Sequence, residues 1–183
     1  VAEIRSLFFT INYLCVMDEI KNKVKESGLI QLDLADFKPK EKMVELDLAS
    51  QLWQGLVLKE KDFRTWIKTE NWEQYENHAV YIHCSADAII PTWAYMLVAS
   101  ALHTRSAYVV VGSKAALEKA LIKRNIEQLD LTDFQGGKVI IKGCSDISCP
   151  EFAMVTLVQK LQSTVVSIMY GEPCSTVPIY KRK

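Results

Sequence analysis

Apolar residues in the middle of the chain follow a strand–helix–strand order. Residues 79–82 form an apolar run, a helical pattern opens at Pro91, and residues 107–111 form a second apolar run. Such runs, without polar alternation, are typical of parallel strands that are buried on both faces. The pattern therefore predicts a first βαβ unit over residues 79–113.

The same order returns in the last third of the chain. An apolar run at 138–141 precedes a helix opened by Pro150, and residues 165–170 form the next run. This predicts a second βαβ unit over residues 138–172, and an internal duplication. The equivalent positions are Cys84 and Cys144, Pro91 and Pro150, and Gly112 and Gly171.

The first third of the chain has a different pattern. Residues 30–37 and 43–48 alternate apolar with polar side chains, as half-buried strands do. Phe63, Trp66 and Ile67 mark an amphipathic helix. We therefore expect an N-terminal α+β portion over residues 17–78.

The first 16 residues form a separate segment in this interpretation. The chain begins with Val1, whereas Met17 precedes an amphipathic stretch that is typical of a protein start. We interpret residues 1–16, including Cys15, as an upstream extension outside the fold. An export signal and a genuine extra element are the alternatives. Residues 17–183 are then one α/β domain.

The fold expected from two βαβ units is an open, mostly parallel sheet. Pseudo-twofold symmetry would give the strand order 2-1-3-4, with the first strands of the two units side by side. Cys84 and Cys144 would end these strands at the topological switch point, where ligands bind. Neighbouring strands lie about 4.8 Å apart, so two thiolates there could share one metal ion. Cys174 leaves the last strand at the same edge.

This geometry predicts a site for zinc or iron, the metals that cysteine ligands favour. Cys84, Cys144 and Cys174 are the expected ligands, and Cys149 and His83 are additional candidates. Strand alternation turns His83 away from Cys84, which makes His83 the weaker candidate. If one coordination position is open, Asp87 or Asp146 could act as general base on a metal-bound water.

Composition narrows the partners. The 22 basic and 22 acidic residues balance, so no net positive charge favours nucleic acid or acidic lipid. No apolar run reaches the roughly 18–20 residues that cross a bilayer. The odd count of five cysteines indicates a reducing, cytoplasmic compartment. No glycine-rich fingerprint predicts a nucleotide cofactor. The tryptophans are typical of core packing: Trp53, Trp66, Trp72 and Trp93.

One local motif resembles a known metal site. The stretch 143–146, Gly-Cys-Ser-Asp, is similar to the first zinc motif of β-class carbonic anhydrases, in which the cysteine binds zinc. That family pairs the aspartate with an arginine two residues on, and here the position is Ser148. The resemblance therefore implies a metal at Cys144 more than it implies hydration of carbon dioxide.

A longer resemblance covers the chain from Met17 onwards. Its stretches are Gly55–Phe63, His83–Met96, Ile141–Cys144 and Ser167–Pro178. They resemble a bacterial family known as domain of unknown function 2480. The resemblance implies no activity, because none is assigned to that family.

Three functions stay open from the sequence. The first is a metal-binding protein with a cysteine-rich site, acting on a small molecule or holding a metal ion. The second is a non-catalytic binding or subunit module whose cysteines are packed in the core. The third is a metal-free enzyme that depends on a reactive thiol. A homo-oligomer is compatible with each.

Overall fold

The described part of the chain contains two sheets whose strands are mostly parallel. The computed structural model describes residues 28–106, 108–143 and 147–183, and it confirms the α/β class. The strands are β1 (Leu29–Asp33), β2 (Met43–Asp47), β3 (Ala79–His83), β4 (Tyr108–Val111), β5 (Lys138–Lys142), β6 (Ser167–Glu172) and β7 (Ser175–Lys181). The helices are α2 (Glu60–Thr69), α3 (Thr92–Leu102), α4 (Lys114–Glu127) and α5 (Pro150–Leu161), with short 3-10 helices η1 (Leu34–Phe37), η2 (Leu48–Gln51), η3 (Trp72–Tyr75) and η4 (Thr132–Phe134).

The two sheets define two lobes. Sheet A has the order β1-β5-β6-β7 and, with α5, forms what we call lobe A. Sheet B has the order β2-β3-β4 and belongs to lobe B, residues 43–111. The predicted single sheet with order 2-1-3-4 is therefore wrong. β3 pairs with β2, and β5 pairs with β1. The first strand of each βαβ unit therefore lies beside a strand from the N-terminal third of the chain, and not beside the first strand of the other unit.

Both predicted βαβ units are present. β3 and β4 are parallel and joined through α3, and β5 and β6 are parallel and joined through α5. Two helix starts are fixed by local signals. Pro150 is the first residue of α5, and the Ser113 hydroxyl caps α4 by accepting the Ala116 N–H at 3.3 Å.

The repeat is longer than the sequence suggested. β1 and β2 end in the same way, because Asp33 and Asp47 each accept a backbone N–H at 2.9 Å and cap the following 3-10 helix. A helix, a 3-10 helix and a βαβ unit follow in both lobes. The residues of lobe B are inserted in the sequence between η1 and α4, two elements of the repeat that forms lobe A. The two strand ends share a four-residue sequence, Leu32-Asp-Leu-Ala35 and Leu46-Asp-Leu-Ala49.

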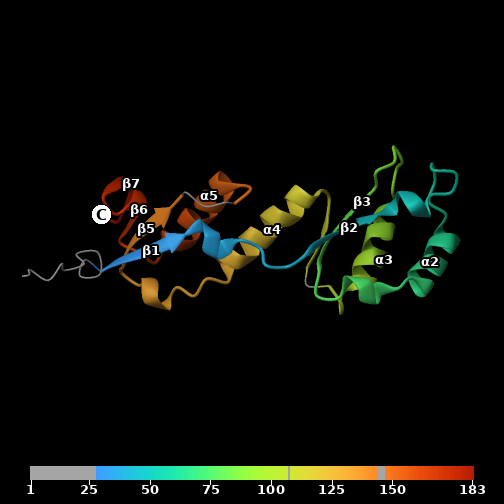
Figure 1. Ribbon diagram of the computed structural model, residues 1–183, viewed down its shortest axis with the longest axis horizontal. Helices are drawn as coiled ribbons and strands as arrows, with labels where there is room; N and C mark the ends of the chain where they lie inside the picture. Colours follow the sequence, from blue (N-terminus) through green and yellow to red (C-terminus); the bar gives the residue numbers. More distant parts are fainter. Residues whose placement is uncertain (1–27, 107, 144–146) are drawn as a thin grey trace, which may run out of the picture.

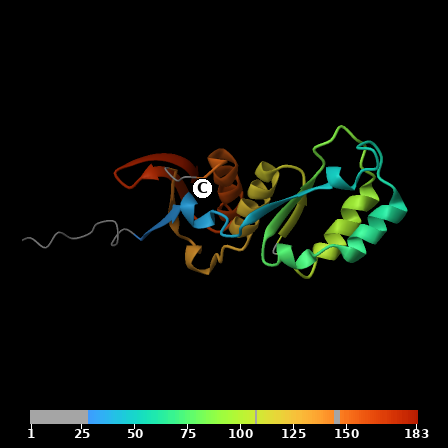
Figure 2. The same ribbon diagram turned by 45° about the vertical axis from the view of Figure 1, so that its right-hand side comes forward.

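Helix α4 belongs to both lobes. Leu117 and Leu121 pack with Ala79 against one face of sheet B. Ile122 and Ile126, further along the helix, are buried in the core of lobe A. Figure 1 shows α4 between the two lobes of an elongated molecule, and Figure 2 shows the same arrangement after a turn.

Polar contacts hold α4 to the segment that links β1 to β2. Arg124 forms an ion pair with Glu41, and its guanidinium lies 5.3 Å from the centre of the Tyr108 ring. The Asn125 side chain donates to the Phe37 carbonyl at 3.1 Å. The burial of Glu41 acts to raise its pKa, but the hydrogen bond and charge of Arg124 outweigh burial, and the pKa is lowered.

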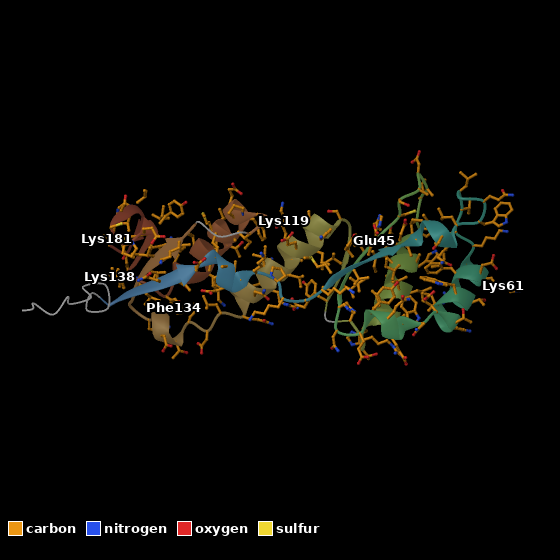
Figure 3. All side chains as sticks on the ribbon, in the orientation of Figure 1. Glu45, Lys61, Lys119, Phe134, Lys138 and Lys181 are labelled. Atoms are coloured by element: carbon orange, nitrogen blue, oxygen red, sulfur yellow. The ribbon has the colours of Figure 1, made fainter. Side chains whose placement is uncertain are left out.

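Side-chain burial separates a core in each lobe. The core of lobe B lies between sheet B and helices α2 and α3, with Phe63, Ile82 and Val98 fully enclosed. Figure 3 places Glu45 and Lys61 in lobe B, Phe134 and Lys138 in lobe A, and Lys119 on α4. Within the described residues, no helix combines the length and hydropathy needed to cross a bilayer. The predicted extension over residues 1–16 lies outside them.

Candidate functional site

The candidate site is the carboxyl edge of sheet B, where β2 and β3 end in register. Asp47 is the register partner of His83. Because the strands are parallel, the loops that follow them leave from one edge, the usual place for ligands in such sheets. Two candidates from the sequence, His83 and Cys84, lie here, and Asp87 follows in the loop between β3 and α3.

Asp47 and Ser85 tie the ends of β2 and β3 together. Asp47 Oδ1 accepts the Ser85 backbone N–H at 3.0 Å, and Oδ2 accepts the Ser85 hydroxyl at 2.5 Å. The burial of Asp47 acts to raise its pKa. The hydrogen bonds from Ser85 and Ala49, with the positive charge of His83, outweigh burial and hold the pKa below its usual value of 3.8. Asp47 is thus kept as a carboxylate.

His83 is bound to a second carboxylate on β2. Its Nε2 lies 2.5 Å from Glu45 Oε1, and its ring stacks on the Tyr81 ring with centroids 5.8 Å apart. Only 26% of the His83 side chain is exposed. These contacts fix the imidazole against the strands and occupy one of its two nitrogens.

Cys84 points to the other side of the sheet. It packs against the core of lobe B, and its thiol lies 3.6 Å from the Ala86 carbonyl as a donor. The prediction that His83 and Cys84 face opposite ways is confirmed. Burial raises the pKa of the Tyr95 hydroxyl, and the nearby Cys84 raises it further. Cys84 is therefore a half-buried residue that packs against the core of lobe B.

The other candidate cysteines lie in lobe A. Cys149 is half-buried against the core of that lobe at the start of α5, and Cys174 is exposed between β6 and β7. Cys144 and Asp146 lie outside the described residues. Residue 144 follows β5, which belongs to sheet A, whereas Cys84 follows β3 in sheet B. The expectation that these two cysteines end neighbouring strands is therefore wrong.

The described side chains do not gather as metal ligands. Within residues 28–106, 108–143 and 147–183, no group of three or more His, Cys, Asp and Glu side chains is arranged to hold a metal ion. His83 and Asp47 instead pair with the neighbouring strand or loop. The described part of the edge is thus a set of matched polar pairs.

Apolar side chains stand exposed on two loops at this same edge. Trp53, Leu56 and Val57 are 48%, 64% and 55% exposed in the loop after η2, and Ile89 is 91% exposed in the loop after β3. We call these four residues the edge patch. Figures 1 and 2 show both loops beyond the same end of sheet B.

The loop of the edge patch has a defined conformation. The Trp53 N–H donates to the Val57 carbonyl at 2.7 Å, and Gly55 takes a positive φ of 71° in the turn between them. Lys59 Nζ lies 3.8 Å from the centre of the Trp53 ring, a cation–π contact. The expectation that the tryptophans pack in the core fits Trp72, which is 8% exposed, but is wrong for Trp53.

An apolar groove lies in lobe A. It has a volume of about 430 Å³ and lies between α5 and the β6–β7 hairpin, with Val155, Tyr170 and Ile179 among its lining residues. None of the polar pairs of sheet B borders it. The groove is therefore a separate feature of the other lobe.

Asp47, Glu45 and the edge patch were not predicted from the sequence. Acidic residues in an alternating strand are typical of a solvent face, so the pattern did not indicate Glu45 and Asp47 as site residues. The repeated Leu-Asp-Leu-Ala at 32–35 and 46–49 was the available signal, since it marks two equivalent strand ends. The edge patch has no comparable signal.

Fold and site together define a two-lobed α/β repeat protein with matched polar pairs and exposed apolar loops at one sheet edge. Comparison with known families places it more narrowly. Residues 18–182 match the family model described as protein of unknown function (DUF2480), and the chain belongs to that family. No curated protein and no solved structure matched the chain.

Proposed function

We propose that this protein is a non-catalytic binding module that holds a protein partner at the carboxyl edge of sheet B. The observation that carries the proposal is the edge patch, in which Trp53, Leu56, Val57 and Ile89 are exposed on two loops at the same end of sheet B. Exposed aromatic and aliphatic side chains that cluster on a surface mark interaction sites.

The polar residues at this edge have a structural role in the proposal. Asp47 holds Ser85, and Glu45 holds His83, so each pair joins β2 to the chain at the end of β3. These links position the loop after β3, which carries Ile89. A rigid base under an apolar patch reduces the ordering cost of binding.

The partner is expected to present apolar side chains. Trp53 offers one large planar surface, and Leu56 and Val57 extend it with aliphatic groups. Lys59 lies over the Trp53 ring, and the exposed Asp87 lies on the loop that carries Ile89. A protein segment with an apolar centre and polar flanks fits this chemistry.

Photo-crosslinking tests the proposal. A photoreactive phenylalanine analogue replaces Leu56 in one variant and Lys61, exposed on α2, in a control variant. We expect discrete protein adducts from position 56 in cells, and their loss when Trp53→Ala and Ile89→Ala are added. The same adducts from position 61, or no adducts from position 56, would contradict the proposal.

Two other functions compete with the binding module. A zinc or iron site on Cys84, Cys144 and Cys174 no longer has the support of neighbouring strands, since β3 and β5 belong to different sheets. A thiol-dependent enzyme would need a reactive Cys84, and Cys84 packs against the core of lobe B. Metal content and thiol reactivity therefore separate the three functions.

A cytoplasmic location in a bacterium is part of the same proposal. Cys84, Cys149 and Cys174, the cysteines in the described part of the chain, are all free thiols. Free thiols, one of them exposed, fit a reducing compartment. Labelling the exposed Cys174 in intact cells with a membrane-impermeant reagent would contradict this location.

A further inference from the structure

β4 is the outer strand of sheet B, with β3 as its neighbour in the described structure. The Gly112 N–H donates to the Ile82 carbonyl of β3 at 2.9 Å. Backbone groups alternate in direction along a parallel strand, so Val110 also faces β3. Val109 and Val111 then direct their N–H and C=O groups outward, and both are available to a further strand.

The corresponding edge of sheet A has a further strand. β6 occupies in lobe A the place of β4 in lobe B, and β7 pairs with it in antiparallel orientation. Ile168 and Tyr170 of β6, which correspond to Val109 and Val111, lie opposite Tyr180 and Val177. The repeat therefore shows that this edge accepts an antiparallel strand.

The described part of the chain does not supply this strand in lobe B. After β4, Gly112 and Ser113 lead directly into α4, whereas after β6 the chain turns back as β7. Gly112 and the equivalent Gly171 both have positive φ values, 132° and 119°, so the two strands end alike. The difference between the repeats is the strand that follows.

The composition of β4 distinguishes it from the other outer strands. Proteins protect exposed sheet edges with charged residues or proline. Among the outer strands of the described sheets, β1 has Asp33, β2 has Glu45 and Asp47, and β7 has Pro178 and Lys181. β4 consists of one tyrosine and three valines. Nothing in this strand opposes pairing with another chain.

We propose that β4 pairs in antiparallel orientation with β4 of a second copy of this chain. A twofold axis at Val110 places Val109 opposite Val111 of the second copy, where each such pair exchanges two backbone hydrogen bonds. The two sheets B become one continuous six-stranded sheet. An uncharged strand places no like charges opposite each other in this arrangement.

Exposed apolar side chains on the same flank of lobe B support this partner. Val111 is 56% exposed and Met96 on α3 is 67% exposed. Their equivalents in lobe A, Tyr170 and Val155, line a groove beside β7. A second copy on β4 would cover Val111 and Met96 as β7 flanks the equivalent residues.

The molecular mass in solution tests the proposal. Light scattering on the full chain is expected to give twice the 20.8 kDa chain mass, and Val111→Lys is expected to give the single-chain mass. Val177→Lys is the matched control, because Val177 is 57% exposed on an outer strand; this variant should remain a dimer. A single-chain mass for the wild type, or a dimer for Val111→Lys, overturns the proposal.

Hydrogen exchange provides a test that needs no variant. The amides of Val109 and Val111 should be protected at high protein concentration and exchange faster on dilution. Fast exchange of these amides at every concentration overturns the proposal. The purified protein would give that result if β4 paired with a different protein. Position 56 lies at another edge of lobe B, so its crosslinking stays a separate result.

Discussion

Asp47 and Ser85 lie 38 residues apart in the chain and are joined by two hydrogen bonds, one to the Ser85 backbone N–H and one to its hydroxyl. Asp47 also caps η2 through the Ala49 N–H. One carboxylate therefore fixes the end of β2, the start of η2 and the loop after β3. The loops that carry the edge patch both depend on this residue.

Removing the Asp47 carboxylate should destabilise the fold. Asp47→Ala loses the cap and both bonds to Ser85, which we expect to cost about 1–3 kcal/mol of unfolding free energy. Asp47→Asn keeps one acceptor oxygen and should cost less. Urea denaturation measures both, with Asp87→Asn as the control at an exposed acid on the same edge. Equal stability of Asp47→Ala and the control would contradict this role.

Acid should weaken the protein partly through Asp47. Its pKa in the folded state lies below the ordinary value of 3.8. Its stabilisation is therefore complete above that value and is lost as the pH falls through the lower, folded pKa. Urea denaturation in a pH series should show a shallower acid loss for Asp47→Asn than for the wild type. Identical pH slopes in the two proteins would show that Asp47 is not linked to folding in this way.

The shared helix α4 should couple the two lobes. Leu121 is fully buried against sheet B, and Leu121→Ala is expected to cost about 2–5 kcal/mol. All four tryptophans lie in lobe B, so their fluorescence follows that lobe, whereas alkylation of Cys149 follows lobe A. Both signals should shift together. Lys119→Ala, at an exposed position of α4, should shift neither. A shift confined to the fluorescence would mean that the lobes unfold separately.

Local patterns predicted the building units of the fold. The continuous apolar runs predicted the parallel strands, and Pro150 predicted a helix start that the structure confirms. Pairing between units was not predictable in the same way. β1 and β2 carry nearly the same sequence at their ends, and only tertiary packing decides that one joins β5 and the other β3.

The candidate site was predicted in part. Strand alternation correctly turned His83 and Cys84 to opposite faces. Asp47 was missed because its role depends on Ser85, which is distant in sequence. Trp53 was missed because an aromatic residue in a short loop has the same appearance in sequence as a core residue, and its 48% exposure depends on the turn at Gly55.

The described thiols should differ in reactivity. Cys174 is exposed, whereas Cys84 and Cys149 are half-buried against the cores of their lobes. Brief alkylation of the native protein followed by peptide mass spectrometry should find Cys174 modified first. Cys174→Ser should remove the fast reaction. Rapid, complete modification of Cys84 in the folded protein would instead favour thiol chemistry at the sheet edge.

The metal content of the full chain, purified without a histidine tag, tests the central claim most directly against the alternative of a cysteine-bound metal. A binding module whose cysteines are not metal ligands should retain only a small fraction of one equivalent of zinc or iron per chain. Cys84→Ala should leave that value unchanged. One equivalent of either metal in the wild type, lost in Cys84→Ala, would contradict the account and return the function to a cysteine-bound metal.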